Sequence, residues 1–489
     1  MSRSVFQPGA SLRPFETRGL VFYAVVTFHP YAQSEAKANH LYSGSMHGHR
    51  QTEAEYGSAE REDRDRDVCS HGLAVHDHMS RVRRAGGRTA SMLRGLWMTF
   101  LGLMTLPATS ALGAESVVVS PMDVQHPSGE RTKPEPSQWH YGGFADLGYS
   151  LDFNFPENHL FRNRSTTPRV NELDLNMAAI YVKKDASEQS RWGMELLAQG
   201  GQDAKDFGFG VNLPRLPGSN ALRHLGRANV SYLAPIGNGL TLQAGIFNSF
   251  IGYESLYAKD NFNYTRAWIA DYSPYLMMGA NAQYQFNDRW AGAFFVITEY
   301  FHLQNSNSLP SYGAQVAYKP TPQWTFKETV YYGPDQVDTS LEFWRLFADT
   351  IAEWKPTDDV TVALEHQIGS QKNATEPGNP RQFYTGGAVI GRWHITGPWS
   401  VTLRPELYWD RNGFHTGAAQ FIKAVTTTAE YRIPYRWTNT ILRLEYRYDE
   451  SRGPDGGFFK NGQVVPGVVG LTPAQHMLIF AVIWTFDSP

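Results

Sequence analysis

The strongest constraint on the fold is an alternation of apolar and polar residues that recurs from residue 139 to the C-terminus. Successive side chains of a strand point to opposite faces, so this pattern predicts strands with one apolar and one polar face. Sixteen such segments can be counted, and most are 9 to 13 residues long. That length matches a tilted strand crossing a bilayer. The candidate strands are 139–153, 172–183, 191–200, 224–234, 240–248, 275–286, 290–300, 311–319, 324–332, 343–354, 360–369, 383–394, 399–410, 421–433, 438–449 and 476–486.

The connections between these segments alternate strictly in length. Each even-numbered segment is followed by a short connection such as PIGNG (235–239), NDR (287–289) or TGP (396–398), whose residues favour tight turns. The odd-numbered segments are followed by longer polar connections. Outer-membrane barrels have short periplasmic turns and long extracellular loops. The sequence therefore predicts an all-β, transmembrane, antiparallel up-and-down β-barrel of about 16 strands, with both termini in the periplasm.

Individual strands also predict which face meets lipid. In the last segment, HMLIFAVIWTF (476–486), one face carries the heavy apolar side chains and the other carries smaller or polar groups. We expect the heavy face, Leu478, Phe480, Val482, Trp484 and Phe486, to lie in lipid. In segment 438–449 we expect Leu442, Leu444, Tyr446 and Tyr448 to face outward, and Arg443, Glu445, Arg447 and Asp449 to face inward. Trp residues near strand ends are typical of the aromatic belts at the bilayer surfaces.

The residues before the barrel have a different composition. Residues 1–78 are polar and aperiodic, which predicts a disordered, non-native N-terminal extension. Residues 79–114 have the Arg-rich start, apolar centre and small residues of a secretory signal peptide. We expect 115–137 to be a flexible periplasmic segment and 138–489 to be the barrel. The single cysteine, Cys69, precedes the predicted cleavage site, so the exported chain would form no disulfide.

Composition argues against several functional classes. The formal net charge of −3 gives no reason to expect a nucleic-acid partner. The body of the chain contains no HExxH motif and no GxSxG motif, so we predict neither an enzyme nor any catalytic, metal or cofactor site. The partners expected instead are outer-membrane lipid, the barrel-insertion machinery, and small polar solutes or ions. Homo-oligomerisation is left open.

One segment resembles a known family. The sequence LQAGIFNSFIGYESLYAKDNFNYTRAW (242–268) contains a GxF strand followed by GxE and by NxxY[ST]R. The matching residues are Gly245, Phe247, Gly252, Glu254, Asn261, Tyr264, Thr265 and Arg266. This pattern resembles the OmpL-like group of bacterial outer-membrane β-barrel porins, and the resemblance extends from about Tyr141 to the C-terminus. The next strand departs from the family pattern, with Met277 and Met278 in place of His-Thr. The resemblance implies a porin in the outer membrane.

A barrel of sixteen strands encloses an aqueous lumen, so we expect passive diffusion of small polar solutes or ions, narrowed by loop 249–274. A substrate-selective channel, for example for sugars, and a non-conducting barrel used for binding or adhesion remain alternatives. Charged side chains at the narrowest point set the selectivity of such a pore. The hypothesised constriction comprises Glu254, Asp260, Arg266, Asp271, Arg227, Arg404, Arg443, Glu406, Glu430 and Glu445.

Two further expectations concern the charges of the predicted lumen. The arginines of the wall and its acids can either face the solute or pair with one another and brace the barrel. Additional acids on inward faces outnumber inward bases, which predicts a weak preference for cations. These acids are Asp146, Asp152, Asp174, Glu195, Asp349 and Glu365.

Overall fold

The structure is a computed structural model that describes residues 139–206, 219–305, 307, 309–336, 343–374 and 376–488. The expected extension, signal peptide and periplasmic segment (1–78, 79–114 and 115–137) lie outside these residues. No helix in the described part of the chain is long and apolar enough to cross a membrane.

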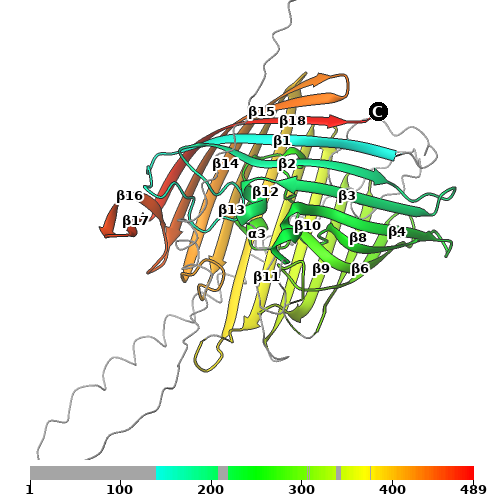
Figure 1. Cartoon of the computed structure of the whole chain (residues 1–489), viewed down its shortest axis with the longest axis horizontal. Helices are drawn as coiled ribbons and strands as arrows, with labels where there is room; N and C mark the ends of the chain where they lie inside the picture. Colours follow the sequence, from blue (N-terminus) through cyan, green and yellow to red (C-terminus); the bar gives the residue numbers. More distant parts are fainter. Residues whose placement is uncertain are drawn as a thin grey trace, which may run out of the picture. The chain divides into compact units, whose positions relative to one another are not determined.

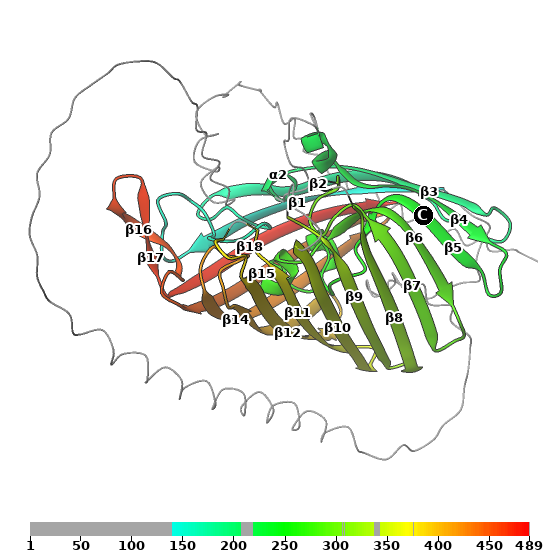
Figure 2. The same cartoon turned by 90° about the horizontal axis from the view of Figure 1, so that it is seen from below.

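Sixteen strands of the described chain close into one barrel, and each strand is antiparallel to both neighbours (Figures 1 and 2). The strands are β1 (Trp139–Asp152), β2 (Leu173–Lys184), β3 (Trp192–Gly200), β4 (Leu225–Ala234), β5 (Leu240–Asn248), β6 (Leu276–Gln285), β7 (Trp290–Ile297), β8 (Ser311–Thr321), β9 (Trp324–Pro334), β10 (Trp344–Thr357), β11 (Val360–Lys372), β12 (Arg381–Thr396), β13 (Trp399–Asp410), β14 (Gln420–Tyr435), β15 (Thr438–Arg452) and β18 (Ala474–Asp487). The predicted fold class is therefore confirmed.

Short elements occupy three of the long connections. Between β3 and β4 lie α2 (Gln202–Asp206) and η3 (Ser219–His224), and between β5 and β6 lie η4 (Ala258–Asp260) and α3 (Trp268–Asp271). The connection from β15 to β18 contains a hairpin, β16 (Phe458–Val465) and β17 (Val468–Thr472), which the sequence analysis did not predict. Figures 1 and 2 place this hairpin beyond one end of the barrel and the C-terminus at the other end.

The first and last strands close the barrel. β1 pairs with β18 from Gly142 opposite Asp487 to Asp152 opposite Met477, and β18 pairs on its other side with β15. Because every barrel strand has two neighbours, none of them presents an unpaired edge to lipid.

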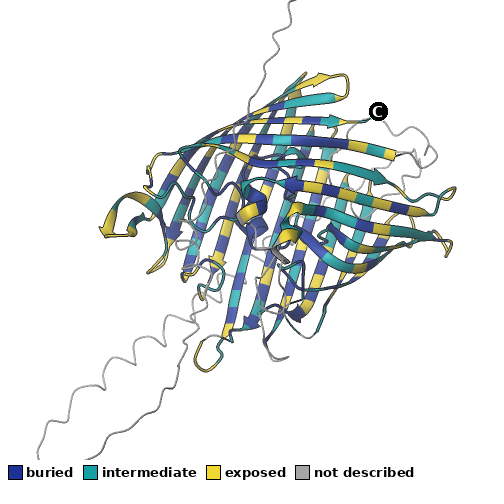
Figure 3. Cartoon of the chain, in the orientation of Figure 1, coloured by how far each residue is buried: buried dark blue, intermediate teal, exposed yellow. Residues whose placement is uncertain are grey.

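The two faces of the wall differ as the alternation predicts (Figure 3). On β15, Leu442, Leu444 and Tyr446 are 37–46% exposed on the outer surface, whereas the inward residues between them are buried. Buried inward residues on this strand are Arg443, Glu445, Arg447 and Asp449. On β18, Phe480, Val482 and Trp484 are exposed as predicted. Several Trp side chains near strand ends are also exposed, among them Trp192, Trp393 and Trp399.

The inward face of β18 is largely apolar. Met477, Ile479, Ala481 and Ile483 point away from lipid and are at most 3% exposed. They belong to a buried cluster that also contains aromatic residues from the connection between β5 and β6. An apolar stripe facing a water-filled lumen would be unfavourable, so these residues are buried because other protein segments cover them inside the barrel.

We expect Leu444→Arg to destabilise the barrel by about 2–4 kcal/mol, because it places a charge near the middle of the lipid-facing surface. Leu444 lies opposite Phe480 and is 46% exposed on that surface. The measurement is the free energy of unfolding in a bilayer. The matched control is Val464→Arg in β16, where the side chain is already 73% exposed in a hairpin outside the barrel. An equal loss in both variants would contradict the lipid-facing assignment.

Candidate pore constriction

The connection from β5 to β6, residues 249–275, leaves the wall and returns to it at adjacent points. The backbone N–H of Ser249 donates to the carbonyl of Tyr275 at 3.0 Å, directly beyond the last strand pair, Asn248 opposite Leu276. Residues 261–277 are all buried. We call residues 249–275 the inner loop. Their polar groups contact inward-facing side chains of strands around the barrel.

The start of the inner loop depends on glycine. Gly252 has φ +92°, a conformation that side-chain-bearing residues rarely adopt. This conformation directs its N–H to the carboxylate of Asp349 on β10, at 2.8 Å. The preceding carbonyl of Phe250 accepts hydrogen bonds from Gln315 on β8 and Thr329 on β9. The first residues of the loop are thus fixed to β8, β9 and β10.

An ion-pair network connects the middle of the inner loop to β13. The guanidinium of Arg404 contacts Glu254 of the loop at 2.6 Å and Glu406 of its own strand at 3.4 Å. It also donates to the carbonyl of Thr265 at 2.5 Å. Glu406 in turn accepts the backbone N–H of Trp268 at 2.5 Å. All of these side chains are buried, so the charges are balanced within the protein and not by water.

β15 provides a second set of contacts. Arg443 contacts Glu430 of β14 at 2.7 Å and donates to the loop carbonyls of Ala258 and Asn263 at 2.7 and 3.0 Å. Glu445 accepts the backbone N–H of Tyr264 at 2.6 Å. A wall arginine therefore satisfies loop carbonyls while a wall carboxylate satisfies loop N–H groups, which is the pairing that buried backbone requires.

The opposite side of the inner loop contacts two other extracellular connections. Arg266 forms an ion pair with Asp203 of α2 at 3.1 Å. Asp271 of α3 forms one with Arg164, from the connection between β1 and β2, at 2.9 Å. These four side chains are buried. The inner loop is therefore packed between the wall and two neighbouring loops.

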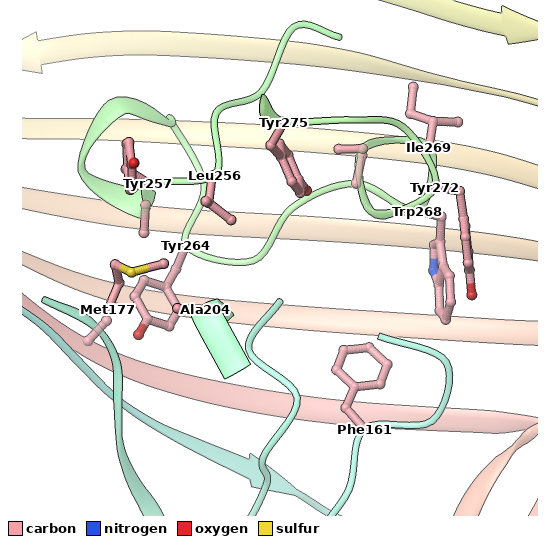
Figure 4. Close-up of a cluster of buried hydrophobic side chains, with 14 of the residues drawn as sticks. Phe161, Met177, Ala204, Leu256, Tyr257, Tyr264, Trp268, Ile269, Tyr272 and Tyr275 are labelled. Atoms are coloured by element: carbon pink, nitrogen blue, oxygen red, sulfur yellow. The ribbon is translucent and has the colours of Figure 1, made fainter. Parts of the chain in front are cut away.

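Aromatic side chains fill the space between these polar contacts (Figure 4). Trp268 packs edge-on against Phe161 at 5.9 Å and lies parallel to Tyr272. The indole N–H of Trp268 donates to Asp449 on β15 at 2.7 Å. Tyr264 extends to the first wall strand, where its hydroxyl donates to Asp146 at 2.6 Å. The loop thus contacts β1 and β15, the two strands that flank β18 in the barrel.

Arg227 and Asp260 differ from the other predicted residues because they retain contact with solvent. Arg227 on β4 pairs with Glu195 on β3 at 2.6 Å, and the two side chains are 13% and 20% exposed. Asp260 pairs with Lys259 of the loop at 2.7 Å, with 18% and 23% exposed. Arg227 and Asp260 are therefore the partly hydrated members of the predicted set.

The structure brings six predicted residues together where the inner loop meets strands β13–β15. They are Glu254 of the loop and Arg404, Glu406, Glu430, Arg443 and Glu445 of the strands. Arg266 and Asp271 point instead toward α2 and the β1–β2 connection. Asp203, Arg164 and Trp268 were not among the site residues predicted from the sequence. Each makes its decisive contact with a residue more than sixty positions away, for which a single sequence contains no signal.

Burial changes the acidity of groups in these connections. It raises the pKa of Asp203 to about 7, although the nearby guanidinium of Arg266 opposes that shift. Burial also raises the pKa of Glu254, with Arg404 opposing. The described residues contain no group of three or more His, Cys, Asp or Glu side chains arranged to hold a metal ion.

One family of known proteins matches nearly the whole barrel. The sequence profile of the family described as "Putative beta-barrel porin-2, OmpL-like" matches residues 138–486. Similar solved structures include an anion-selective porin from Comamonas acidovorans, the outer membrane channel DcaP of Acinetobacter baumannii, and Salmonella typhi OmpF in complex with daunomycin. Their sequence identities are 11%, 10% and 11%, and their TM-scores are 0.46, 0.45 and 0.46. Each alignment covers 72% of this chain and 100%, 97% and 97% of the other. Curated proteins give no match.

Proposed function

This chain belongs to the OmpL-like β-barrel porin family of the bacterial outer membrane, and on that premise we propose a diffusion pore for small polar solutes or ions that the inner loop narrows. The observation that carries the proposal is the attachment of this loop to the far wall. Arg404 and Arg443 on β13 and β15 contact it through an ion pair and through backbone carbonyls. A loop attached at both sides of a barrel reduces the cross-section open to solutes.

The proposed constriction includes the ten residues predicted from the sequence, with two different roles. The buried members hold the inner loop in position: Glu254, Arg266, Asp271, Arg404, Glu406, Glu430, Arg443 and Glu445. Arg227 and Asp260, which are partly exposed, contact the permeating solute. Such a division fits a fixed constriction, because fully paired buried charges position a segment more firmly than hydrated ones.

The experiment is single-channel recording. The expected exported chain, residues 115–489, is refolded in detergent, its folding is checked by resistance to unfolding in cold SDS, and it is added to a planar bilayer in KCl. We expect steady open steps whose conductance is lower than that of the same barrel with the inner loop removed. A folded barrel that never conducts would contradict the porin proposal and favour binding through the extracellular loops. Block by one class of sugar would identify a selective channel.

A further inference from the structure

The side chains that meet water below the inner loop are mainly basic. We consider inward-facing residues within four positions of the periplasmic end of a barrel strand, and we call this set the periplasmic band. Among the described residues, the band contains six basic side chains and three carboxylates. The basic members are Lys183, Lys319, Lys327, Lys355, Arg392 and Arg432, and the acidic members are Glu195, Glu353 and Asp487.

Alternation along the strands places these residues inside the barrel. Lys355 follows Glu353 and Ile351 on the inward face of β10, whereas Trp354 between them is 39% exposed outward. On β12, Val389 and Trp393 point outward. Arg392 lies on the opposite, inward face, together with buried Ile390. Arg392 is paired in regular register with Thr361 and Thr402, which fixes its direction. Lys355 lies in a register shift that follows Trp354, and its ion pair with inward Glu353 keeps its ammonium on the lumen side.

In two ion pairs of the inward face near the periplasmic end, the base is more exposed than the acid. Lys355 is 33% exposed, whereas its partner Glu353, at 2.9 Å, is 5% exposed. Arg432 is 33% exposed and contacts Glu430, which is 4% exposed, at 2.6 Å. The same carboxylate also contacts Arg443 and lies 4.0 Å from Arg392. One buried carboxylate therefore serves three arginines, which leaves a local excess of positive charge.

The inward acids that suggested cation preference have a different environment. Asp146, Asp349 and Glu365 are fully buried, and the first two accept hydrogen bonds from the inner loop. Glu365 accepts one from Gln367. Because permeating ions respond most strongly to charges at the water-filled surface, an excess of buried acids weighs less than exposed bases.

We propose that this channel prefers anions, and that the basic side chains of the periplasmic band, foremost Lys355, Arg392 and Arg432, determine that preference. The inference rests on the proposed porin function and names the class of solute: small, hydrated anions such as chloride or carboxylates. Its sign is opposite to the expectation from counting inward acids, because the inner loop covers acids such as Asp146 and Asp349, whereas Lys355 and Arg432 stay in contact with water.

The test is the reversal potential of the refolded barrel between asymmetric KCl solutions. We expect chloride to permeate better than potassium, with less selectivity near 1 M KCl, where the Debye length falls to about 3 Å. The variant Lys355→Glu with Arg432→Glu takes the net charge of the band from three positive to one negative, so we expect the reversal potential to change sign. Lys355→Gln with Arg432→Gln should give an intermediate reversal potential. This neutral variant provides the test if the charge-reversed variant does not fold.

The matched control is Lys460→Glu with Arg452→Glu, the same change in charge at the extracellular end. Arg432 lies opposite Ile441, and Arg452 is eleven residues farther along β15, roughly 35 Å away and more than three Debye lengths in 0.1 M salt. We expect little shift in this control. Cation preference in the conducting wild type, or equal shifts of the reversal potential in both charge-reversed variants, would overturn the proposed anion preference and leave the porin proposal intact. Absence of conductance from a folded barrel would overturn the porin proposal together with it.

Discussion

Replacing residues 250–274 with a short turn is expected to raise the single-channel conductance several-fold. The strands on either side are already paired up to Asn248 opposite Leu276, and Ser249 bonds to Tyr275, so a tight turn can join them without changing their register. The deletion removes the segment that connects β8–β10 with β13 and β15 across the lumen. Conductance grows with the water-filled cross-section, which explains the direction of the effect.

The deletion should leave the barrel closed. The strand-to-strand hydrogen bonds of the wall do not involve the inner loop, and wall charges such as Arg404 and Glu445 regain water when the loop is absent. Stability should nevertheless fall, because the apolar inward face of β18 loses its cover. Resistance to cold SDS reports on closure, and bilayer recording reports on conductance.

The matched deletion removes residues 454–472, which contain the β16–β17 hairpin. Its ends are also adjacent, since the N–H of Ser451 donates to the carbonyl of Pro473 at 2.7 Å. This hairpin lies beyond the end of the barrel in both views, so its loss should change conductance much less (Figures 1 and 2). Similar conductance in wild type and in a folded inner-loop deletion would contradict the proposed constriction.

Arg404→Met is expected to lower the free energy of unfolding by about 3–5 kcal/mol, the usual cost of breaking a buried ion pair from one side. Arg404 is fully buried and contacts Glu254 and Glu406. Glu406 keeps a second partner, Arg447, at 3.2 Å, but Glu254 loses the guanidinium that balances its charge. Methionine retains most of the side-chain volume, so the loss reports on charge more than on a cavity. Denaturant unfolding followed by tryptophan fluorescence measures it.

The double variant Glu254→Gln with Arg404→Met should recover part of the lost stability, because the amide oxygen can still accept the N–H of Ala267 without burying a charge. Arg452→Ala is the surface control. Arg452 is 67% exposed and pairs with Glu450, so its loss should cost about 0–1 kcal/mol. A loss of under about 1 kcal/mol for Arg404→Met would show that the buried pair does not fasten the loop.

The wall of the barrel was predictable from the sequence almost in full. Segments 240–248 and 399–410 match β5 and β13 at both ends, and the remaining barrel strands differ from their predicted ranges by a few residues. Turn residues located the hairpins, and the period of two assigned each face, because a shift of one residue would reverse every side chain of a strand. The β16–β17 hairpin was missed, since a Gly-rich connection without clean alternation gives no strand signal.

The candidate site was predicted in composition but not in pairing. Glu254 and Arg404 were both predicted as site residues, and the structure joins them across 150 positions of the chain. Arg266 and Asp271 were also predicted, and their partners Asp203 and Arg164 belong to loops without any distinguishing pattern. An apolar inward stripe on β18 was the available signal that a segment covers the lumen side of that wall: Met477, Ile479, Ala481 and Ile483 are aligned on one face.

Sequence alone determined the number, order and faces of the strands, because backbone geometry repeats every two residues and leaves a local record in the chain. It also marked the inner loop through the motif that contains Gly252, Glu254 and Arg266. Only the tertiary structure decided which inward charges are buried against the loop and which meet water. That outcome depends on contacts between residues far apart in the chain, and neither a period nor a composition encodes them.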